Sequence, residues 1–314
     1  FDEEDRHRVT RDTTTKNIIY QFDYNQDGLL TQVTDGDGNI ITIERDAGGN
    51  ATALVAPDGQ RTEFGVNENG MLNQVTDPAG NRWSMQYTND DLLTRFEDPN
   101  GNVDRFEYNA NGRLTHNSQP NGGSWDLART DLESSFQTQM TSAEGQVYNY
   151  AVERSAIGER IYTDTAPDGT VTKRRFTGTE INITRPDGTQ IIQELGADPR
   201  FHMMAPVTTS ERIITPGGLV REQIRERTAE LTDFLEPLSH TALSETTRIN
   251  GRSFRSEYEA DSRTWTATSP EGRTRRQTLD ANGRPIEIQI TGLAPTQLGY
   301  DERGRLTGLL TGEG

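Results

Sequence analysis

The sequence contains no cysteine, which excludes disulfides, thiol nucleophiles and zinc–thiolate sites and leaves the redox compartment open. Lysine is nearly missing too, because only Lys16 and Lys173 stand among 32 basic residues. The net charge of -17 argues against nucleic-acid binding, which needs basic patches to neutralise phosphates. The many arginines can instead cross-link neighbouring strands through bidentate pairs with carboxylates.

Apolar residues are scarce, at 31% of the chain, and no apolar run is long enough to span a membrane. Such a composition is typical of a disordered chain, or of a sheet one layer thick that buries fewer apolar residues than a two-layer core. Aromatic and β-branched residues recur at a fixed spacing, and this argues against disorder. The chain opens at Phe1 without an initiator methionine or a signal peptide, and we expect both ends to be cut from a longer array.

Recognisable catalytic motifs are missing, including the G-x-S-x-G elbow, H-E-x-x-H and the phosphate-binding loop. A glycosidase-like pair among the many acidic residues stays open, but no pair stands out. The histidines have no ligand-like spacing and are interpreted as surface or packed residues; they are His7, His116, His202 and His240. We therefore predict no catalytic, cofactor-binding or metal-binding residues.

The sequence does contain a repeat of 21 residues, which runs without insertion through residues 20–123. Two series of turn residues mark it: Gly28, Gly49, Gly70, Asp91 and Gly112, and then Gly38, Gly59, Gly80, Gly101 and Gly122. Proline, Asn and Asp precede these glycines, which is the chemistry of tight turns whose last glycine has a positive φ. Two turns in each unit leave strands of roughly six residues between them.

Between the turns, side chains alternate as they do in strands. One face carries the larger set, with Tyr20, Phe22 and Tyr24, then Ile41, Ile43 and Arg45, Thr62, Phe64 and Val66, Trp83, Met85 and Tyr87, and Asp104, Phe106 and Tyr108. The residues between them are mostly polar. This pattern predicts an all-β fold, a continuous antiparallel β-meander of hairpins, although a 21-residue period also suits a parallel β-helix.

Beyond residue 123 the repeat drifts over residues 124–264 and becomes regular again over 265–310, so we predict a single array across 1–314. Residues 196–217 are interpreted as a loop that plugs or crosses the sheet, or as a wide connection. Residues 219–236 have a helical period near 3.6, but we favour a strand because Gly218 and Gly251 stand three half-periods apart.

Two acidic clusters resemble calcium loops; they are Asp23, Asn25, Asp27 and Gly28, and Asp35, Asp37 and Asn39. An EF-hand loop needs an acid at its twelfth position, which is Thr34 here, and turn chemistry explains the same residues without a metal. A row of aromatic residues can stack on sugars or pack the inner face of the sheet, and we favour packing; the row is Tyr20, Trp83, Tyr87, Tyr108 and Trp125.

Three segments resemble the tyrosine–aspartate (YD) repeat of RHS and teneurin proteins: Phe22-Asp-Tyr-Asn25, Phe106-Glu-Tyr-Asn109 and Tyr300-Asp-Glu-Arg-Gly304. The resemblance is clear over 20–123 and 265–310, and it implies a β-strip that spirals into a hollow shell or tube, often around a toxin domain. The self-cleaving aspartate-rich core of the toxin-delivery members is absent. Two similar segments, Asp77-Pro-Ala-Gly80 and Asp98-Pro-Asn-Gly101, lie in repeat register and are interpreted as turns.

The resemblance implies a non-enzymatic structural segment of a large RHS-repeat polypeptide that is secreted or exposed at the cell surface. Its partners would be the neighbouring repeats and, in a polymorphic toxin, an encapsulated C-terminal effector. The alternative is an extracellular adhesion or self-assembling fibre element that binds glycans, proteins or copies of itself. No cofactor, nucleic-acid partner or membrane span is expected.

Overall fold

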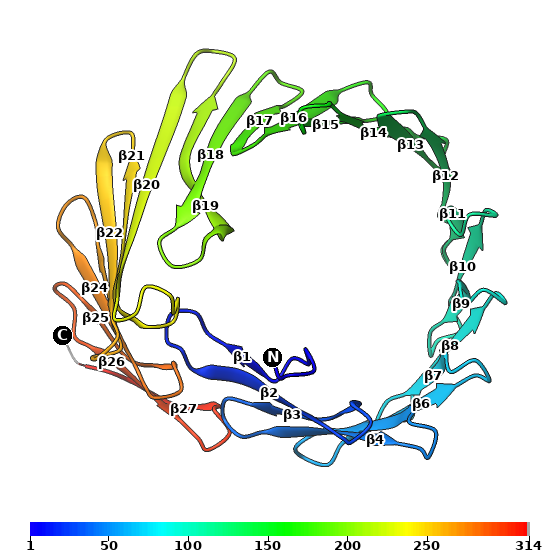
Figure 1. The fold of residues 1–314 in the computed structure, drawn as a ribbon, viewed down its shortest axis with the longest axis horizontal. Helices are drawn as coiled ribbons and strands as arrows, with labels where there is room; N and C mark the ends of the chain where they lie inside the picture. Colours follow the sequence, from blue (N-terminus) through cyan, green and yellow to red (C-terminus); the bar gives the residue numbers. More distant parts are fainter. Residues whose placement is uncertain (313–314) are drawn as a thin grey trace. The chain divides into compact units, whose positions relative to one another are not determined.

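The computed structural model describes residues 1–312, in which strands and turns alternate and no residue is helical. These residues form 27 strands of one sheet, coloured along the chain in Figure 1. Paired strands are consecutive in the chain and antiparallel, as in β7–β8 and β23–β24. The antiparallel meander is therefore confirmed, and a parallel β-helix is excluded.

Two compact units make up the described chain. The first comprises residues 1–8, 22–34 and 39–172, and the second comprises residues 9–21, 35–38 and those from Lys173 onward. The single array expected over 1–314 stays a prediction, and its residues 313–314 lie outside the described residues. Within residues 1–312, no helix could cross a membrane.

The first unit consists of short hairpins. Its strands are β4 (Ile40–Arg45), β5 (Ala51–Val55), β6 (Arg61–Val66), β7 (Leu72–Thr76), β8 (Arg82–Tyr87), β9 (Leu93–Glu97), β10 (Val103–Tyr108), β11 (Leu114–Ser118), β12 (Ser124–Asp131), β13 (Ser135–Ser142), β14 (Val147–Arg154) and β15 (Arg160–Thr165). In β8, Trp83 and Tyr87 are half-buried on one face, while Arg82 and Gln86 are exposed. The apolar face stays half-buried because one sheet offers no second layer to cover it.

The turns have the predicted backbone. Gly59, Gly80, Gly101 and Gly122 have φ between 82° and 87°, and Asp91 takes the missing place of the other series at φ 60°. Side chains close the same turns: Asp77 Oδ1 accepts the backbone N–H of Ala79 at 2.9 Å and of Asn81 at 2.8 Å. The Asn81 side-chain amide and these N–H groups hold the pKa of Asp77 below its ordinary value of 3.8.

Tyrosine has a specific role in the repeat. The hydroxyls of Tyr87, Tyr108 and Tyr300 each donate to a carbonyl 15 residues earlier, at 2.6, 2.8 and 2.9 Å. Each acceptor is the first residue of a strand, where the ladder begins and a carbonyl needs a donor. Where Arg45 replaces tyrosine, its guanidinium donates to the Leu30 carbonyl in the same way. Tyr87 and Tyr108 are therefore half-buried and tied to the sheet by their hydroxyls, whereas Tyr20 of the same row is 45% exposed.

Replacing Gly101 with alanine should lower the free energy of unfolding by about 1–2 kcal/mol, because an L-residue is strained at its φ of 82°. Apart from Gly101 itself and its two chain neighbours, no atom lies within 4 Å of the place where a Cβ would stand, so the backbone conformation accounts for the loss. Urea unfolding of Gly101→Ala measures it. Gly101→Asn, which tolerates positive φ, is the control and should lose less. Equal stability of Gly101→Ala and wild type would contradict the predicted backbone role.

The second unit has longer strands. They are β1 (Val9–Arg11), β17 (Glu180–Thr184), β18 (Gln190–Asp198), β19 (His202–Ile214), β20 (Val220–Leu231), β21 (His240–Ile249), β22 (Arg252–Glu259), β23 (Thr264–Thr268), β24 (Thr274–Leu279), β25 (Pro285–Ile290), β26 (Thr296–Tyr300) and β27 (Leu306–Thr311). Three more strands, β2 (Ile18–Tyr24), β3 (Leu30–Asp35) and β16 (Val171–Thr177), have residues in both units. The strand favoured for residues 219–236 is confirmed over Val220–Leu231 as β20, whereas residues 232–236 belong to the turn that follows it.

The prediction of a loop or wide connection over residues 196–217 is wrong, since β18 and β19 form one long hairpin there. Its pairing is interrupted between Gly196↔Val207 and Asp198↔His202. Pro206 lies in this irregularity, where a residue without an N–H is tolerated. Gly196 is needed nearby, because a Cβ would stand 2.5 Å from Thr209 Cγ2. Proline and methionine in the sequence therefore marked a bulge in a hairpin and not the end of the sheet.

Buried side chains gather in the second unit. Its buried residues are Thr189, Ile191, Asp198, His240, Tyr258, Thr264 and Leu279, whereas the first unit contributes Ala53, Ser142 and Val152. His240 and Tyr258 are the largest fully buried side chains, at 0% and 2% exposure. Polar and ionisable groups thus sit in the best-covered part of the molecule, and this region is the candidate functional site.

Candidate functional site

The N-terminal loop, residues 12–17, connects β1 to β2. Asp12 organises it, because its Oδ1 accepts the backbone N–H of Thr14 at 2.9 Å and of Thr15 at 2.6 Å. The backbone N–H of Lys16 donates to the Asp12 carbonyl at 2.9 Å, and Lys16 has a left-handed φ of 65°. This is an Asx turn, in which a short acidic side chain replaces backbone partners. The loop therefore presents its Thr13 and Thr14 carbonyls outward in one conformation.

These carbonyls meet the His240 cluster, which we define as Asp198, Arg200, Arg227, His240 and Tyr258. His240 Nε2 lies 2.6 Å from the Thr14 carbonyl, and Arg200 donates to the Thr13 carbonyl. Lys16 Nζ in turn donates to the His240 backbone carbonyl at 2.6 Å. Figure 1 shows the loop between β1 and β2 (blue) beside the loop that joins β20 to β21 (yellow). Three hydrogen bonds thus fasten the loop to two segments, at Arg200 and at His240, that each lie more than 180 residues further along the chain.

Asp198 holds the arginines of the cluster. Its side chain is 5% exposed, and it lies 3.6 Å from Arg200 Nε and 3.5 Å from Arg227 Nη1. Asp198 Oδ1 also accepts the backbone N–H of Arg200 at 2.9 Å, which closes the β18–β19 turn. Beside the cluster is a cavity of about 280 Å³, lined in part by Thr14, Arg227 and Trp265. The buried carboxylate is therefore both the counter-ion and the turn anchor of the cluster.

The tautomer of His240 follows from its contact. A carbonyl only accepts, so Nε2 carries the proton, and Nδ1 is buried without a hydrogen-bond partner among residues 1–312. Burial is the largest effect and lowers the pKa of His240 below 6.5. The positive charges of Lys16 and Arg200 also lower this pKa, whereas hydrogen bonds to the Thr14 and Pro237 carbonyls raise it. A general base of the Ser–His–Asp type has its second nitrogen held by a carboxylate, and His240 has no such partner within the described chain. The arrangement binds the N-terminal loop.

A second contact fastens the turn at residues 35–38. Asp37 Oδ1 accepts from Arg284 Nη1 at 2.6 Å and from the Asn282 side chain at 3.1 Å. Arg284 also donates to Asp280 and lies 4.9 Å from the Tyr300 ring centroid. Asp37, a member of the second calcium candidate, is therefore paired with a guanidinium. In the first candidate, Asn25 Oδ1 accepts the backbone N–H groups of Asp27 and Leu29, which is the turn chemistry we favoured.

The four histidines have different surroundings. His7 packs edge-on against Phe1 and Phe22, with ring centroids 5.1 and 4.9 Å away. His116 Nδ1 lies 2.7 Å from Asp126 Oδ1, and His202 follows the β18–β19 turn at φ 51°. Within residues 1–312, no three His, Asp or Glu side chains gather in a group that could hold a metal ion.

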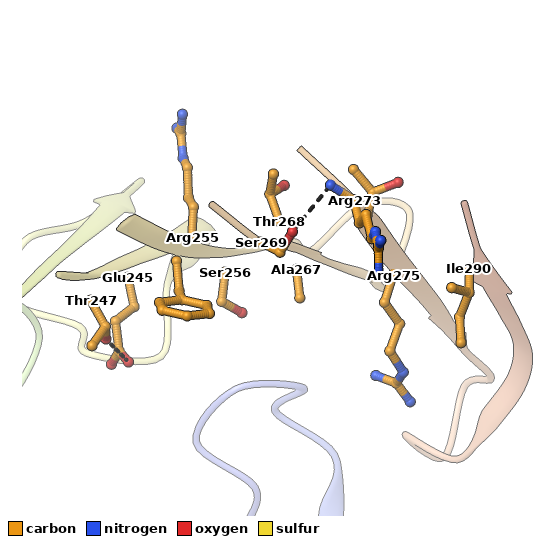
Figure 2. A pocket seen from close by; sticks show the side chains of 12 residues that line it. Glu245, Thr247, Arg255, Ser256, Ala267, Thr268, Ser269, Arg273, Arg275 and Ile290 are labelled. Atoms are coloured by element: carbon orange, nitrogen blue, oxygen red, sulfur yellow. Dashed lines mark hydrogen bonds between the residues drawn. The ribbon is translucent and has the colours of Figure 1, made fainter. Parts of the chain in front are cut away.

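An open depression of about 380 Å³ lies over β21 to β25 (Figure 2). Ser256 pairs with Ala267, and Ala267 pairs with Arg275, which pairs with Ile290 on the next strand. Figure 2 shows these four side chains on one side of the strands, whereas Arg255 points the other way. The depression exists because two small residues stand in a row of longer ones, and its lining has no arrangement of catalytic groups.

Sequence reasoning interpreted His240 as a surface or packed histidine and did not find the residues that it packs against. The residues missed are Lys16, Asp198, Arg200, Arg227 and Tyr258. The one signal that could have found Lys16 is that it is one of only two lysines in an arginine-rich chain. Arg248 donates from Nη1 and Nη2 to the two carboxylate oxygens of Glu226, at 2.7 and 3.3 Å, which confirms the expected cross-strand arginine–carboxylate pairs.

Comparison with known proteins agrees with this geometry. The sequence model of the family described as "Teneurin YD-shell" matches residues 1–313. Teneurin-4 of Mus musculus is 40% identical over 60 residues, and Teneurin-1 of Homo sapiens is 43% identical over 54 residues. These matches cover 19% and 17% of this chain and about 2% of either relative, so the chain spans a small part of the curated relatives it matches.

Among solved structures, the chain is similar to "Crystal Structure of TcdB2-TccC3-TEV" at a TM-score of 0.49 and 13% identity. That match covers 91% of this chain and 18% of the other. The family match extends over nearly the whole sequence. The chain therefore belongs to the Teneurin YD-shell family and is a structural segment of a YD-repeat shell.

Proposed function

We propose that this shell segment walls off space around a C-terminal effector or another cargo of the same large polypeptide, and that it performs no chemistry. The observation that carries the proposal is the sheet itself. Of the described residues, only five apolar side chains are buried: Ala53, Val152, Ile191, Tyr258 and Leu279. A compact enzyme of this length would bury far more. Secretion or display at the cell surface, by analogy with the family, completes the proposal.

The test is protection from protease. In the full-length polypeptide, a protease recognition sequence is placed in the segment C-terminal to the repeats. The matched control places the same sequence in the exposed turn at Asn109–Gly112 of an otherwise identical protein. We expect the control to be cut and the C-terminal site to resist at the same protease concentration until the repeats unfold. Equal cleavage rates, or a gene that encodes nothing beyond the repeats, would contradict encapsulation.

A fibre or adhesion element is the second candidate, and β27 is the observation that favours it. All six of its residues are exposed, including Leu306, Leu309 and Leu310 at 54, 61 and 66%. Within residues 1–312, β27 pairs with β26 alone. An apolar strand edge pairs readily with a further strand, either of the same polypeptide or of another copy. Concentration-dependent filaments of the purified chain, detected by light scattering, would favour this candidate over the first.

A further inference from the structure

We propose that His240 is the pH-sensitive element of a latch that holds the N-terminal loop, residues 12–17, on the second unit and releases it in acid. The proposal concerns how this unit is held together and does not depend on what the shell encloses. It starts from the contacts already described: the imidazole holds the Thr14 carbonyl, Arg200 holds the Thr13 carbonyl, and Lys16 returns to His240.

The docked loop requires a neutral imidazole. Nε2–H already donates to Thr14, and Nδ1 is buried with no partner among the described residues. A second proton on the ring would place a charged N–H in a buried site, where only the Pro237 carbonyl offers partial compensation. Burial outweighs that carbonyl, so the charged ring is disfavoured while the loop is docked. When the loop is detached and the cluster is open, water would solvate the protonated ring. Protonation of His240 therefore opposes docking of the loop, and docking of the loop opposes protonation of His240.

The surrounding charges act in the same direction. The ionisable side chains that face the ring and its neighbours are Asp12 and Lys16 from the loop, Asp198 and Arg200 from the β18–β19 hairpin, Arg227 from β20, Tyr258 from β22 and Arg263 beside β23. The carboxylates are already engaged, Asp198 by Arg200 and Arg227, and Asp12 by the N–H groups of its own loop. Protonation of His240 would therefore add a third positive charge beside Lys16 and Arg200, and both of these carboxylates already have partners.

The sign of the pH dependence follows. Because burial lowers the pKa of His240 below its ordinary value of 6.5, the open state takes up a proton before the docked state does. Docking is at full strength above pH 6.5 and weakens as the pH falls toward the lowered pKa, below which no further loss occurs. Between these limits the docking equilibrium changes by up to about tenfold per pH unit.

Hydrogen exchange of the backbone amides of residues 12–17 tests the latch in the whole chain. After correction for intrinsic exchange, we expect their protection to stay constant between pH 7.5 and about pH 6.5 and to fall below that by up to about tenfold per pH unit, measured down to pH 5. In His240→Gln, whose amide cannot titrate, the corrected protection should not vary with pH. His116→Gln is the matched control, since His116 lies in the first unit beside Asp126 and its loss should leave the wild-type profile unchanged.

Wild-type protection that does not change with pH would overturn the proposal, and so would an acid loss that persists in His240→Gln. Because that variant loses a buried group and can fail to fold, an NMR titration of the wild-type His240 ring gives an independent measurement. A ring pKa below 6.5, with loop protection falling over the same pH range, is the expected result. A ring pKa at or above 6.5 would show that docking does not oppose protonation.

Discussion

Asp198→Ala should cost the second unit about 3–5 kcal/mol of its free energy of unfolding, because it leaves two arginines beside a buried site without their counter-ion. The side chains of Asp198 and Arg200 are 5% and 11% exposed, so water compensates little, whereas Arg227 at 34% can turn outward. The β18–β19 turn also loses the acceptor for the Arg200 backbone N–H. We expect the loss in urea unfolding followed by Trp265 fluorescence, with Trp83 and Trp125 replaced by phenylalanine.

Asp198→Asn separates the two roles of this carboxylate. An asparagine keeps an oxygen that accepts the Arg200 backbone N–H but has no charge for the guanidinium groups. The free energy of unfolding of Asp198→Asn should therefore lie between those of wild type and Asp198→Ala. If Asp198→Ala unfolds within about 0.5 kcal/mol of wild type, the range of an ordinary surface change, Asp198 is not the anchor of the cluster.

The repeat was readable from sequence because each of its parts is local. A positive φ at Gly101, an Asx turn at Asp77 and an alternating strand at Trp83–Tyr87 each depend on residues a few positions away. Local hydrogen bonds and the period of 2 therefore fix the turns and the faces together. The longest of these contacts is made by the tyrosine of the motif, whose hydroxyl reaches a carbonyl 15 residues earlier, still within the period of the repeat.

The His240 cluster was not readable, because its contacts join residues that share no period. The bond from His240 to Thr14 spans 226 positions, and nothing in either local sequence specifies the other. The hairpin at 196–217 was misread for a related reason. Pro206 and the methionines beside it are local breaker signals, but long-range pairing of Glu194 with Ser210 overrides them. Prediction thus succeeded where the fold repeats and failed where the chain makes single contacts.

Tyr258→Ala should destabilise the second unit by about 3–5 kcal/mol, the usual cost of emptying a well-packed aromatic site. Its side chain is 2% exposed and lies against Trp265 and His240, with ring centroids 5.1 and 6.3 Å away. Its removal opens a cavity under the imidazole that holds Thr14. In a sheet with few buried side chains, the neighbours have little to repack into this space, so relaxation recovers little.

Phe254→Ala is the matched control, because Phe254 lies on the same strand and the same face as Tyr258 but is 41% exposed. A similar number of atoms is removed, and the expected loss is about 1 kcal/mol or less because most of the ring already contacts water. Both variants are compared by urea unfolding followed by Trp265 fluorescence. Equal losses would mean that β22 contributes general sheet stability and that Tyr258 is not a core residue. A large loss for Tyr258→Ala alone would place the core of the unit beneath the N-terminal loop.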